Sequence, residues 1–135
     1  MAVLKKNDKG IMAINNDLLR STIIDDIKNE DNLVLCNKKG APVKKTFFGG
    51  PDDIRNSVII RDNKENLSIA IFFLINVYND ADNIAENIIA KVSNLLDTIC
   101  INRPCIITCK YKGLIDKEGN ITERDIEFNS RYECR

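Results

Sequence analysis

The run from Leu67 to Tyr78 constrains the fold more than any other part of the chain. Every second position in it is apolar: Leu67, Ile69, Ile71, Phe73, Ile75 and Val77. This period of two predicts a β-strand with one fully buried face. The other face is mixed, because Ser68 and Asn76 alternate with apolar residues, and we expect it to be partly covered. A strand of this kind requires a second layer over its apolar face.

An amphipathic helix is predicted directly after this strand. Its apolar residues recur at helical spacing: Ile84, Ile88, Val92, Leu95 and Ile99. The acidic and amide-rich stretch between strand and helix places Asp80 or Asp82 where a helix takes its N-cap. Counted from Asp80, the stretch fails the calcium-loop pattern at Ile84, Ala85 and Lys91. We therefore interpret these acids as a helix cap rather than a metal site.

Three further elements precede the long strand. A helix is predicted to begin after Asn15 or Asn16 and to end near Lys28, because Leu19, Ile23 and Ile27 recur at helical spacing. The short apolar run 33–36 is either a strand or a tether packed on the core. Residues 57–61 form a second strand, which a polar turn joins to the long one.

The last third of the chain reads as a β-hairpin. Residues 104–112 alternate, Asp116–Asn120 supplies the turn, and the returning strand has one apolar and one charged side. Its apolar side carries Ile126, Phe128, Tyr132 and Cys134. Its charged side carries Glu123, Asp125, Glu127, Asn129, Arg131, Glu133 and Arg135. One side of this strand is therefore expected to face the core and the other the solvent.

Residues 37–56 form a long excursion from this pattern. They hold three of the six glycines and two of the three prolines of the chain. Long excursions inside compact domains are usually either functional or disordered, so this one is the first candidate for a partner surface. This one contains Lys44-Lys45-Thr46-Phe47-Phe48, a basic pair next to two aromatic residues, which is the minimum for stacking nucleic-acid bases. Because 20 basic residues balance 20 acidic ones, we favour a protein interface and predict no sequence-specific nucleic-acid binding.

Length and element order together predict the architecture. A chain of 135 residues is most simply one domain, 1–135, with residues 1–10 loosely ordered. The order of elements predicts an α+β fold, a two-layer sandwich of a mainly antiparallel sheet with two helices packed on one face. Ferredoxin-like variants also fit this order.

The sequence predicts no enzyme, no cofactor and no metal. Histidine, the commonest general base, does not occur in it. Cys100, Cys105 and Cys109 are spaced C-x4-C-x3-C, but no C-x2-C pair accompanies them, so we interpret Cys105 and Cys109 as core residues. The N-terminal residues carry no signal-peptide pattern, and the longest apolar run, 69–75, is too short to cross a bilayer. We expect a protein of the cytoplasm with reduced cysteines and no membrane partner.

The layout resembles the tail terminator or tail completion proteins, the small subunits that form rings in the neck and tail of tailed bacteriophages. Three segments carry the resemblance: "NDLLRSTIIDDI", "AIFFLINVYNDADNIAENIIAKVSNLLD" and "ITERDIEFNSRYECR". The resemblance implies a non-catalytic structural subunit of the virion, made in the host cytoplasm. Its partners would be copies of itself, closing a ring with a passive DNA channel, and other phage neck and tail proteins.

A ring of identical subunits needs two different patches on each subunit. We predict the 44–51 loop as one patch and the charged side of the last strand as the other. The candidate interface residues are Lys44, Lys45, Phe47, Phe48, Pro51, Glu127 and Arg131.

A second family is also similar, the alkaline-shock envelope-stress proteins of bacteria. The similarity rests on Lys9-Gly10-Ile11-Met12-Ala13-Ile14, on a strand ending in tyrosine and on the helix "IAENIIAKV". It would imply a cytosolic scaffold recruited to a membrane anchor. The long excursion and the closing hairpin speak against it.

Overall fold

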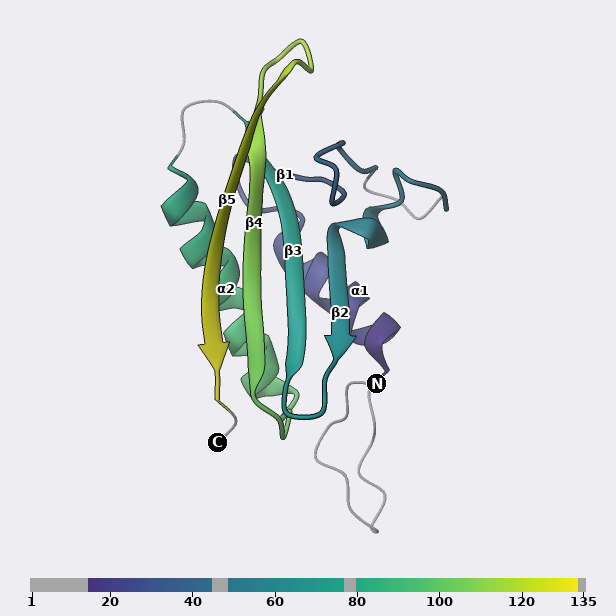
Figure 1. The fold of residues 1–135 in the computed structure, drawn as a ribbon, viewed down its shortest axis with the longest axis vertical. Helices are drawn as coiled ribbons and strands as arrows, with labels where there is room; N and C mark the ends of the chain where they lie inside the picture. The colour runs from purple at the N-terminus through teal and green to yellow at the C-terminus, as the bar shows by residue number, and fades with distance from the viewer. Residues whose placement is uncertain (1–14, 45–48, 77–79, 134–135) are drawn as a thin grey trace.

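Two helices lie behind a five-stranded sheet in the computed structural model, which describes residues 15–44, 49–76 and 80–133 (Figure 1). The elements follow in the order α1 (Asn16–Ile27), β1 (Leu33–Leu35), the 3₁₀ helix η1 (Ile54–Ser57), β2 (Val58–Asp62), β3 (Leu67–Asn76), α2 (Ala81–Thr98), β4 (Cys105–Ile115) and β5 (Ile121–Tyr132). The predicted α+β fold is confirmed. The predictions for Tyr78, Cys134, residues 1–10 and the Lys9–Ile14 motif fall outside the described residues.

β3 is the strand that joins the two halves of the sheet. On one side, β1 pairs with residues 73–75 and β2 with residues 67–71, both antiparallel. On the other side, β4 pairs with β3 in parallel, and β5 closes the sheet antiparallel to β4. The sheet is therefore mixed, and the parallel pair at its centre is the departure from a purely antiparallel arrangement. The sequence did not decide whether residues 33–36 form a strand or a tether. In the structure, Leu33–Leu35 form strand β1.

Helix α2 is the crossover that this parallel pair requires, because parallel neighbours cannot be joined by a tight turn. Asp80 caps the helix, with its carboxylate accepting the Asp82 N–H at 3.0 Å. At the other end, Cys100 has a φ of 56° and its N–H donates to the Asp97 carbonyl at 3.1 Å. A residue with positive φ just after the last turn is a common way to stop a helix. The prediction that the acids after β3 form a cap is confirmed.

Both helices contribute to one hydrophobic core. The core contains Leu19, Ile23 and Ile27 of α1, Ile84, Ile88 and Val92 of α2, and the predicted apolar side of β3 from Leu67 to Ile75. α1 is capped by Asn15, whose side chain accepts the Leu18 N–H at 2.7 Å. A smaller cluster of Cys36, Phe72 and Leu74 is buried separately. The second side of β3 is therefore covered in part, as predicted, and we call this side of the sheet the open face.

The β4–β5 hairpin carries an irregularity halfway along its length. Phe73 and Leu74 are consecutive in β3, but their partners in β4 are Tyr111 and Gly113. Lys112 is therefore an extra residue, which makes a β-bulge. At Gly113, φ is 149°, and an added Cβ would lie 2.4 Å from the carbonyl oxygen of Thr122 in β5. The close approach of the two backbones requires glycine here.

Replacing Gly113 by alanine should therefore destabilise the protein strongly. We expect Gly113→Ala to lower the free energy of unfolding by about 2–4 kcal/mol, because backbone strain and a clash with the β5 backbone add together. Gly119→Ala is the matched control, since Gly119 has a φ of 86° but nothing within 4 Å of the added Cβ. It should cost only about 1–2 kcal/mol. Urea denaturation measures both, and equal losses would contradict the proposed close approach.

Candidate interaction surface

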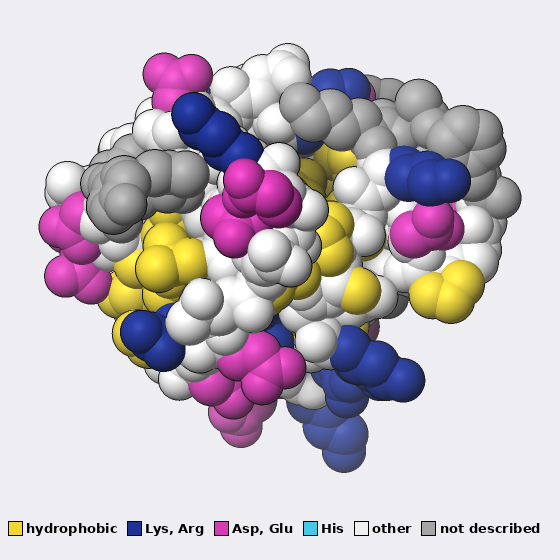
Figure 2. All heavy atoms as spheres, turned by 90° about the horizontal axis from the view of Figure 1, so that it is seen from above, with side chains coloured by type: hydrophobic (Ala, Val, Ile, Leu, Met, Phe, Trp, Pro, Cys, Tyr) yellow, Lys and Arg dark blue, Asp and Glu magenta, His cyan; other side chains and the backbone are white. Residues whose placement is uncertain are grey.

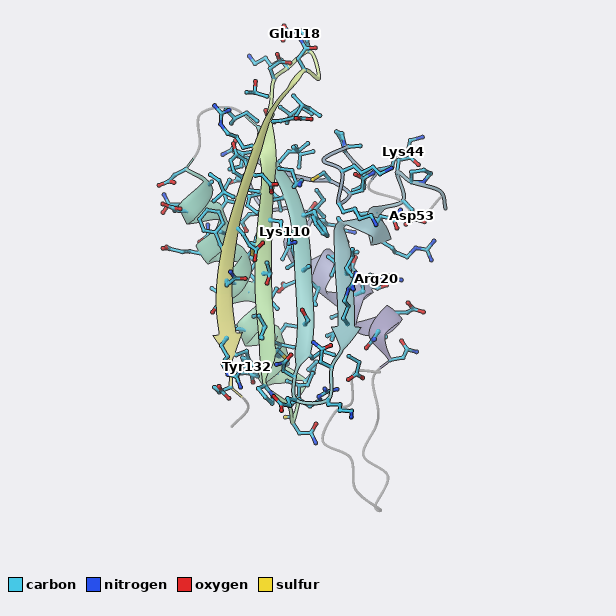
Figure 3. The ribbon with its side chains drawn as sticks, viewed as in Figure 1. Arg20, Lys44, Asp53, Lys110, Glu118 and Tyr132 are labelled. Atoms are coloured by element: carbon cyan, nitrogen blue, oxygen red, sulfur yellow. The ribbon has the colours of Figure 1, made fainter. Side chains whose placement is uncertain are left out.

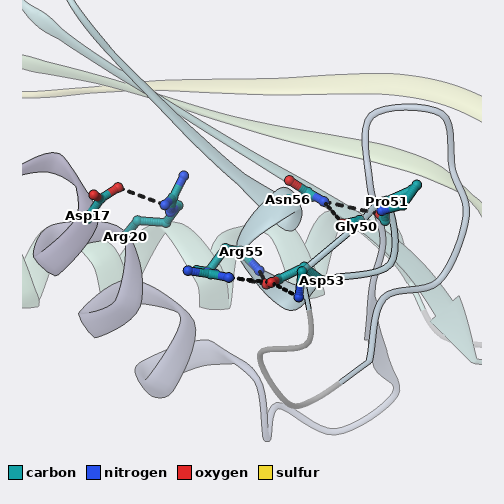
Figure 4. A network of polar contacts seen from close by, with 8 residues as sticks. Asp17, Arg20, Gly50, Pro51, Asp53, Arg55 and Asn56 are labelled. Atoms are coloured by element: carbon teal, nitrogen blue, oxygen red, sulfur yellow. Dashed lines mark hydrogen bonds and ion pairs between the residues drawn. The ribbon is translucent and has the colours of Figure 1, made fainter.

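Asp53 anchors the last part of the excursion loop (residues 37–56) to the start of the 3₁₀ helix η1. Its buried carboxylate accepts the N–H of Gly49 at 2.7 Å and the N–H of Arg55 at 2.9 Å. The Arg55 side chain adds two bonds, from Nε at 3.0 Å and from Nη2 at 2.5 Å (Figure 4). Asp53 is also the N-cap of η1. One carboxylate therefore fixes both the end of the loop and the start of the element that leads into β2.

The charge of Asp53 is stabilised by these contacts. The hydrogen bonds from the Arg55 guanidinium are the main cause that holds the pKa of Asp53 well below its ordinary value of 3.8, and the N–H groups of Arg55 and Gly49 act in the same direction. Burial opposes them by favouring the neutral form. The carboxylate is therefore ionised throughout the neutral range and tightens the loop there.

Two asparagine side chains hold the outer part of the loop. The Asn37 amide donates to the Pro51 carbonyl at 3.3 Å. The Asn56 amide donates to the Pro51 carbonyl at 3.2 Å and to the Gly50 carbonyl at 2.8 Å (Figure 4). Pro51, one of the predicted interface residues, is thereby fixed and exposed. These bonds join residues 37, 50, 51 and 56, so the beginning and end of the excursion are fastened together.

Lys44, the second predicted interface residue of the loop that the structure describes, is also exposed. Its N–H donates to the Asp52 carbonyl at 2.8 Å, and its ammonium lies 3.5 Å from the Asp52 carboxylate. The predictions for Lys45, Phe47 and Phe48 concern positions outside the described residues. The loop surface is therefore defined here by Lys44, Pro51 and Asp52.

The charged side of β5 forms the second predicted surface. Glu127 and Arg131 are exposed on it, and the Glu127 carboxylate lies 3.8 Å from the ammonium of Lys110 in β4. Arg131 contacts Glu133. At the end of the strand, the Tyr132 hydroxyl donates to Asp97 of α2 at 2.6 Å, which fastens β5 to the helix layer. Figure 3 shows Lys110 along the middle of this region and Tyr132 at the end of β5.

The two predicted surfaces lie at opposite edges of the sheet. β5 forms one edge, and β1 and β2, which the excursion loop connects, form the other. Figure 3 shows the same separation, with Lys44 and Asp53 on the side opposite β5. The structure therefore brings Lys44 and Pro51 together, and Glu127 and Arg131 together, but it does not join the two groups into one site.

A hollow of 580 Å³ lies on the open face between one arm of the loop and the hairpin. Its lining residues are Lys39, Gly40, Ala41, Lys112, Ile121, Glu123, Arg124 and Asp125. Viewed from the end of the molecule that carries the 116–120 turn, basic and acidic side chains are interspersed with hydrophobic ones (Figure 2). The hollow has charges of both signs, and the Lys112 ammonium lies 3.5 Å from the Asp125 carboxylate.

The contribution of β4 to this surface was not among the predicted interface residues. Lys110 and Lys112 of β4 pair with Glu127 and Asp125 of β5, so the open face carries cross-strand ion pairs. The alternation of residues 105–112 signalled that these lysines share one side of a strand. It did not signal which acids would lie opposite them, because register is a property of the paired strands.

The four cysteines that the structure describes do not gather in one site. Cys105 and Cys109 are fully buried in the core against the helices, Cys36 is buried in the cluster of the open face, and Cys100 is exposed after α2. Among residues 15–44, 49–76 and 80–133, no three side chains of metal-ligating type form a group. In the same part of the chain, neither helix is long and apolar enough to span a membrane.

No family model, curated protein or solved structure matches this chain.

The Asp53 anchor makes stability depend on pH in a defined direction. Because its folded-state pKa is depressed, its stabilising contribution is complete above about pH 4 and is lost as the pH falls further. At pH 7, Asp53→Asn should lower the free energy of unfolding by about 1–3 kcal/mol, as expected for hydrogen bonds to a charged group. The difference from the unsubstituted protein should shrink as the pH falls below about 4. Denaturation at several pH values measures it.

The neighbouring Asp52→Asn variant is the control for this experiment. Asp52 lies only 3.5 Å from the largely exposed Lys44 ammonium, and such surface pairs contribute about 0–1 kcal/mol. A loss at Asp52 as large as the loss at Asp53, or a difference for Asp53 that does not change with pH, would contradict the anchoring role.

The burial of the cysteines predicts which thiols react in the native protein. Burial raises the pKa of Cys109 to about 12 and that of Cys36 to about 12, with Lys112 opposing the shift at Cys36. The reactive thiolate is therefore scarce and inaccessible at both. We expect a maleimide at pH 7.5 to modify Cys100 quickly, and to modify Cys36 and Cys109 only after unfolding. Peptide mass spectrometry reads out each site. Equal rates at Cys100 and Cys109 in native protein would show that the core is not closed.

Proposed function

We propose that this protein is a structural subunit of a ring in the neck or tail of a tailed bacteriophage, of the tail terminator or tail completion type. The observation that carries the proposal is the placement of the two predicted surfaces at opposite edges of one sheet. The order of elements, from an early helix through a strand–helix unit to a closing hairpin, supports it as well. The role is assembly rather than turnover.

Opposite surfaces favour a head-to-tail contact between copies. When one patch of a subunit meets a different patch of the next, the contact repeats around an axis and closes into a ring if the rotation allows it. The loop surface and the exposed side of β5 are far apart on the subunit and carry different side chains, so they fit this requirement. A ring formed in this way would join the connector to the tail tube and leave a passive channel for DNA.

Both surfaces are held in place before assembly, which lowers the entropic cost of association. The loop surface is fixed by the Asp53 anchor and by the asparagine bonds at Pro51. The β5 surface is fixed at its end by Tyr132 and along its length by pairing with β4. Charges of both signs on each surface favour one relative orientation over non-specific adhesion.

The test uses two variants of the full chain, each with one altered surface. Lys44→Glu combined with Pro51→Asp alters the loop surface, and Glu127→Arg combined with Arg131→Glu alters the β5 surface. We expect rings of the unsubstituted protein in negative-stain images, alone or with purified neck and tail proteins, and no rings from either variant. A mixture of the two variants should form a one-to-one complex but no ring, because each retains one intact surface.

Sedimentation velocity supplies the quantitative readout. A protein that stays unassembled at every concentration, and that does not assemble on addition of neck and tail proteins, would contradict the proposed function. Rings from a variant with an altered surface would show that the contact lies elsewhere.

A further inference from the structure

The outer edge of β5 is the longest unpaired strand edge in the described part of the molecule. β5 runs over 12 residues and pairs with β4 on one side, and no described strand pairs with its other side. Such an edge presents a row of backbone N–H and C=O groups to any strand that can align with it. The bulge disturbs the pairing with β4 at residues 124–125, but from Ile126 to Tyr132 the register is regular.

We propose that the occupant of this edge is β5 of a second copy, paired antiparallel about a two-fold axis at Asn129. The regular stretch, Ile126 to Tyr132, reads IEFNSRY, and it is complementary to itself in this register. Glu127 lies opposite Arg131 of the second copy, and the symmetry repeats the pair. Ile126 lies opposite Tyr132, Phe128 opposite Ser130, and Asn129 opposite its own equivalent.

The charges in this register are accessible to a partner. The Glu127 and Arg131 side chains are each 53% exposed; within the subunit Glu127 lies 3.8 Å from Lys110 and Arg131 contacts Glu133. Exposed pairs of this kind contribute little, so a partner's charge can replace them. Directly opposite residues in an antiparallel pair have Cβ atoms about 4.5–5.5 Å apart, close enough for a carboxylate to meet a guanidinium. Two such pairs form in each dimer.

The apolar side of the same stretch points to the same register. Ile126 is 44% exposed and is one of two large exposed hydrophobic residues that the structure describes, the other being Leu18 on α1. In the proposed dimer, Ile126 packs beside Tyr132 of the second copy, whose ring is already held in place by the bond to Asp97 at 2.6 Å. The pairing therefore covers an apolar side chain that the subunit leaves in contact with solvent.

Asn129 is suited to the position on the axis. Its side-chain oxygen accepts the Thr108 hydroxyl at 2.8 Å, which orients the amide. An amide supplies both donors and an acceptor, so two asparagines on a two-fold axis can hydrogen-bond to each other. Glutamate or arginine at this position would place like charges opposite each other.

The two-fold axis stands perpendicular to the sheet, so the two sheets become one. The helix layers of both copies stay on one side and both open faces on the other. The dimer itself does not depend on the proposed ring function. If that function holds, however, the dimer covers Glu127 and Arg131 and withholds the β5 surface from ring assembly until the copies separate.

Charge exchange tests the register. In sedimentation equilibrium of the full chain, we expect Glu127→Arg and Arg131→Glu, each alone, to weaken dimerisation at least roughly tenfold, because two opposite-charge pairs become like-charge pairs. The double variant should dimerise again, within about threefold of the unsubstituted protein. Arg61→Glu on β2 and Glu118→Arg in the hairpin turn make the same charge changes on exposed residues away from β5 and should have no effect.

A cysteine on the axis gives an independent measurement. In a background of Cys100→Ser and Cys134→Ser, we expect Asn129→Cys to form a covalent dimer under mild oxidation and Arg61→Cys to form none. Three outcomes would overturn the proposal. The protein could remain a monomer at all concentrations, or the double variant could dimerise as weakly as the single variants. Cross-linking at position 61 but not at position 129 would overturn it as well. Rings without a dimer would overturn it and leave the proposed function standing. A dimer whose copies separate on addition of neck and tail proteins without forming rings would overturn the proposed function and leave the dimer standing.

Discussion

The parallel pairing of β3 with β4 is the contact on which the rest of the structure depends. Because the two strands run in the same direction, the chain that leaves β3 must return along the length of the sheet before β4 begins, and α2 makes this return. The return lays α2 across β4 and β5, so that Ile84, Ile88 and Val92 join the core that the apolar side of β3 also lines. Fully burying an aliphatic side chain contributes about 1.5–3 kcal/mol. The same order of strands leaves β5 at the edge. The β3–β4 pairing therefore accounts both for the position of α2 over the core and for the unpaired outer edge of β5.

The sequence predicts the elements well because their signals are local. The period of two in β3, the period near 3.6 in α2, and the cap residues Asn15 and Asp80 each act within a few residues, and each prediction is confirmed. The pairing of strands depends on residues far apart in the chain. The parallel β3–β4 pair and the shared β3 edge of β1 and β2 therefore could not be read from periodicity.

The candidate surfaces also combine features that the sequence marks locally with features that depend on tertiary contacts. The excursion and the charged side of β5 could be located in the sequence, because composition and alternation mark them directly. The role of Asp53 could not, since it depends on contacts with Gly49 and Arg55 that only the folded loop creates. The pairing of Lys110 with Glu127 depends likewise on register across two strands. Whether a charged residue lies in a solvated turn or in a buried anchor is decided by the tertiary structure.

The bulge at Lys112 also determines the direction in which the β4–β5 hairpin runs beyond it. Between the same two rungs of the ladder, β3 has no intervening residue, β4 has Lys112, and β5 has Arg124 and Asp125. The outer strands therefore use more residues than β3 to span the same distance along the sheet. As a result, the sheet curves within its own plane, with β3 on the inside of the curve. Figure 1 shows β5 leaning over β4 at this end. Residues 123–125 at this bend and Lys39, Gly40 and Ala41 of the loop together line the hollow on the open face, so the curvature of the strands forms one of its walls.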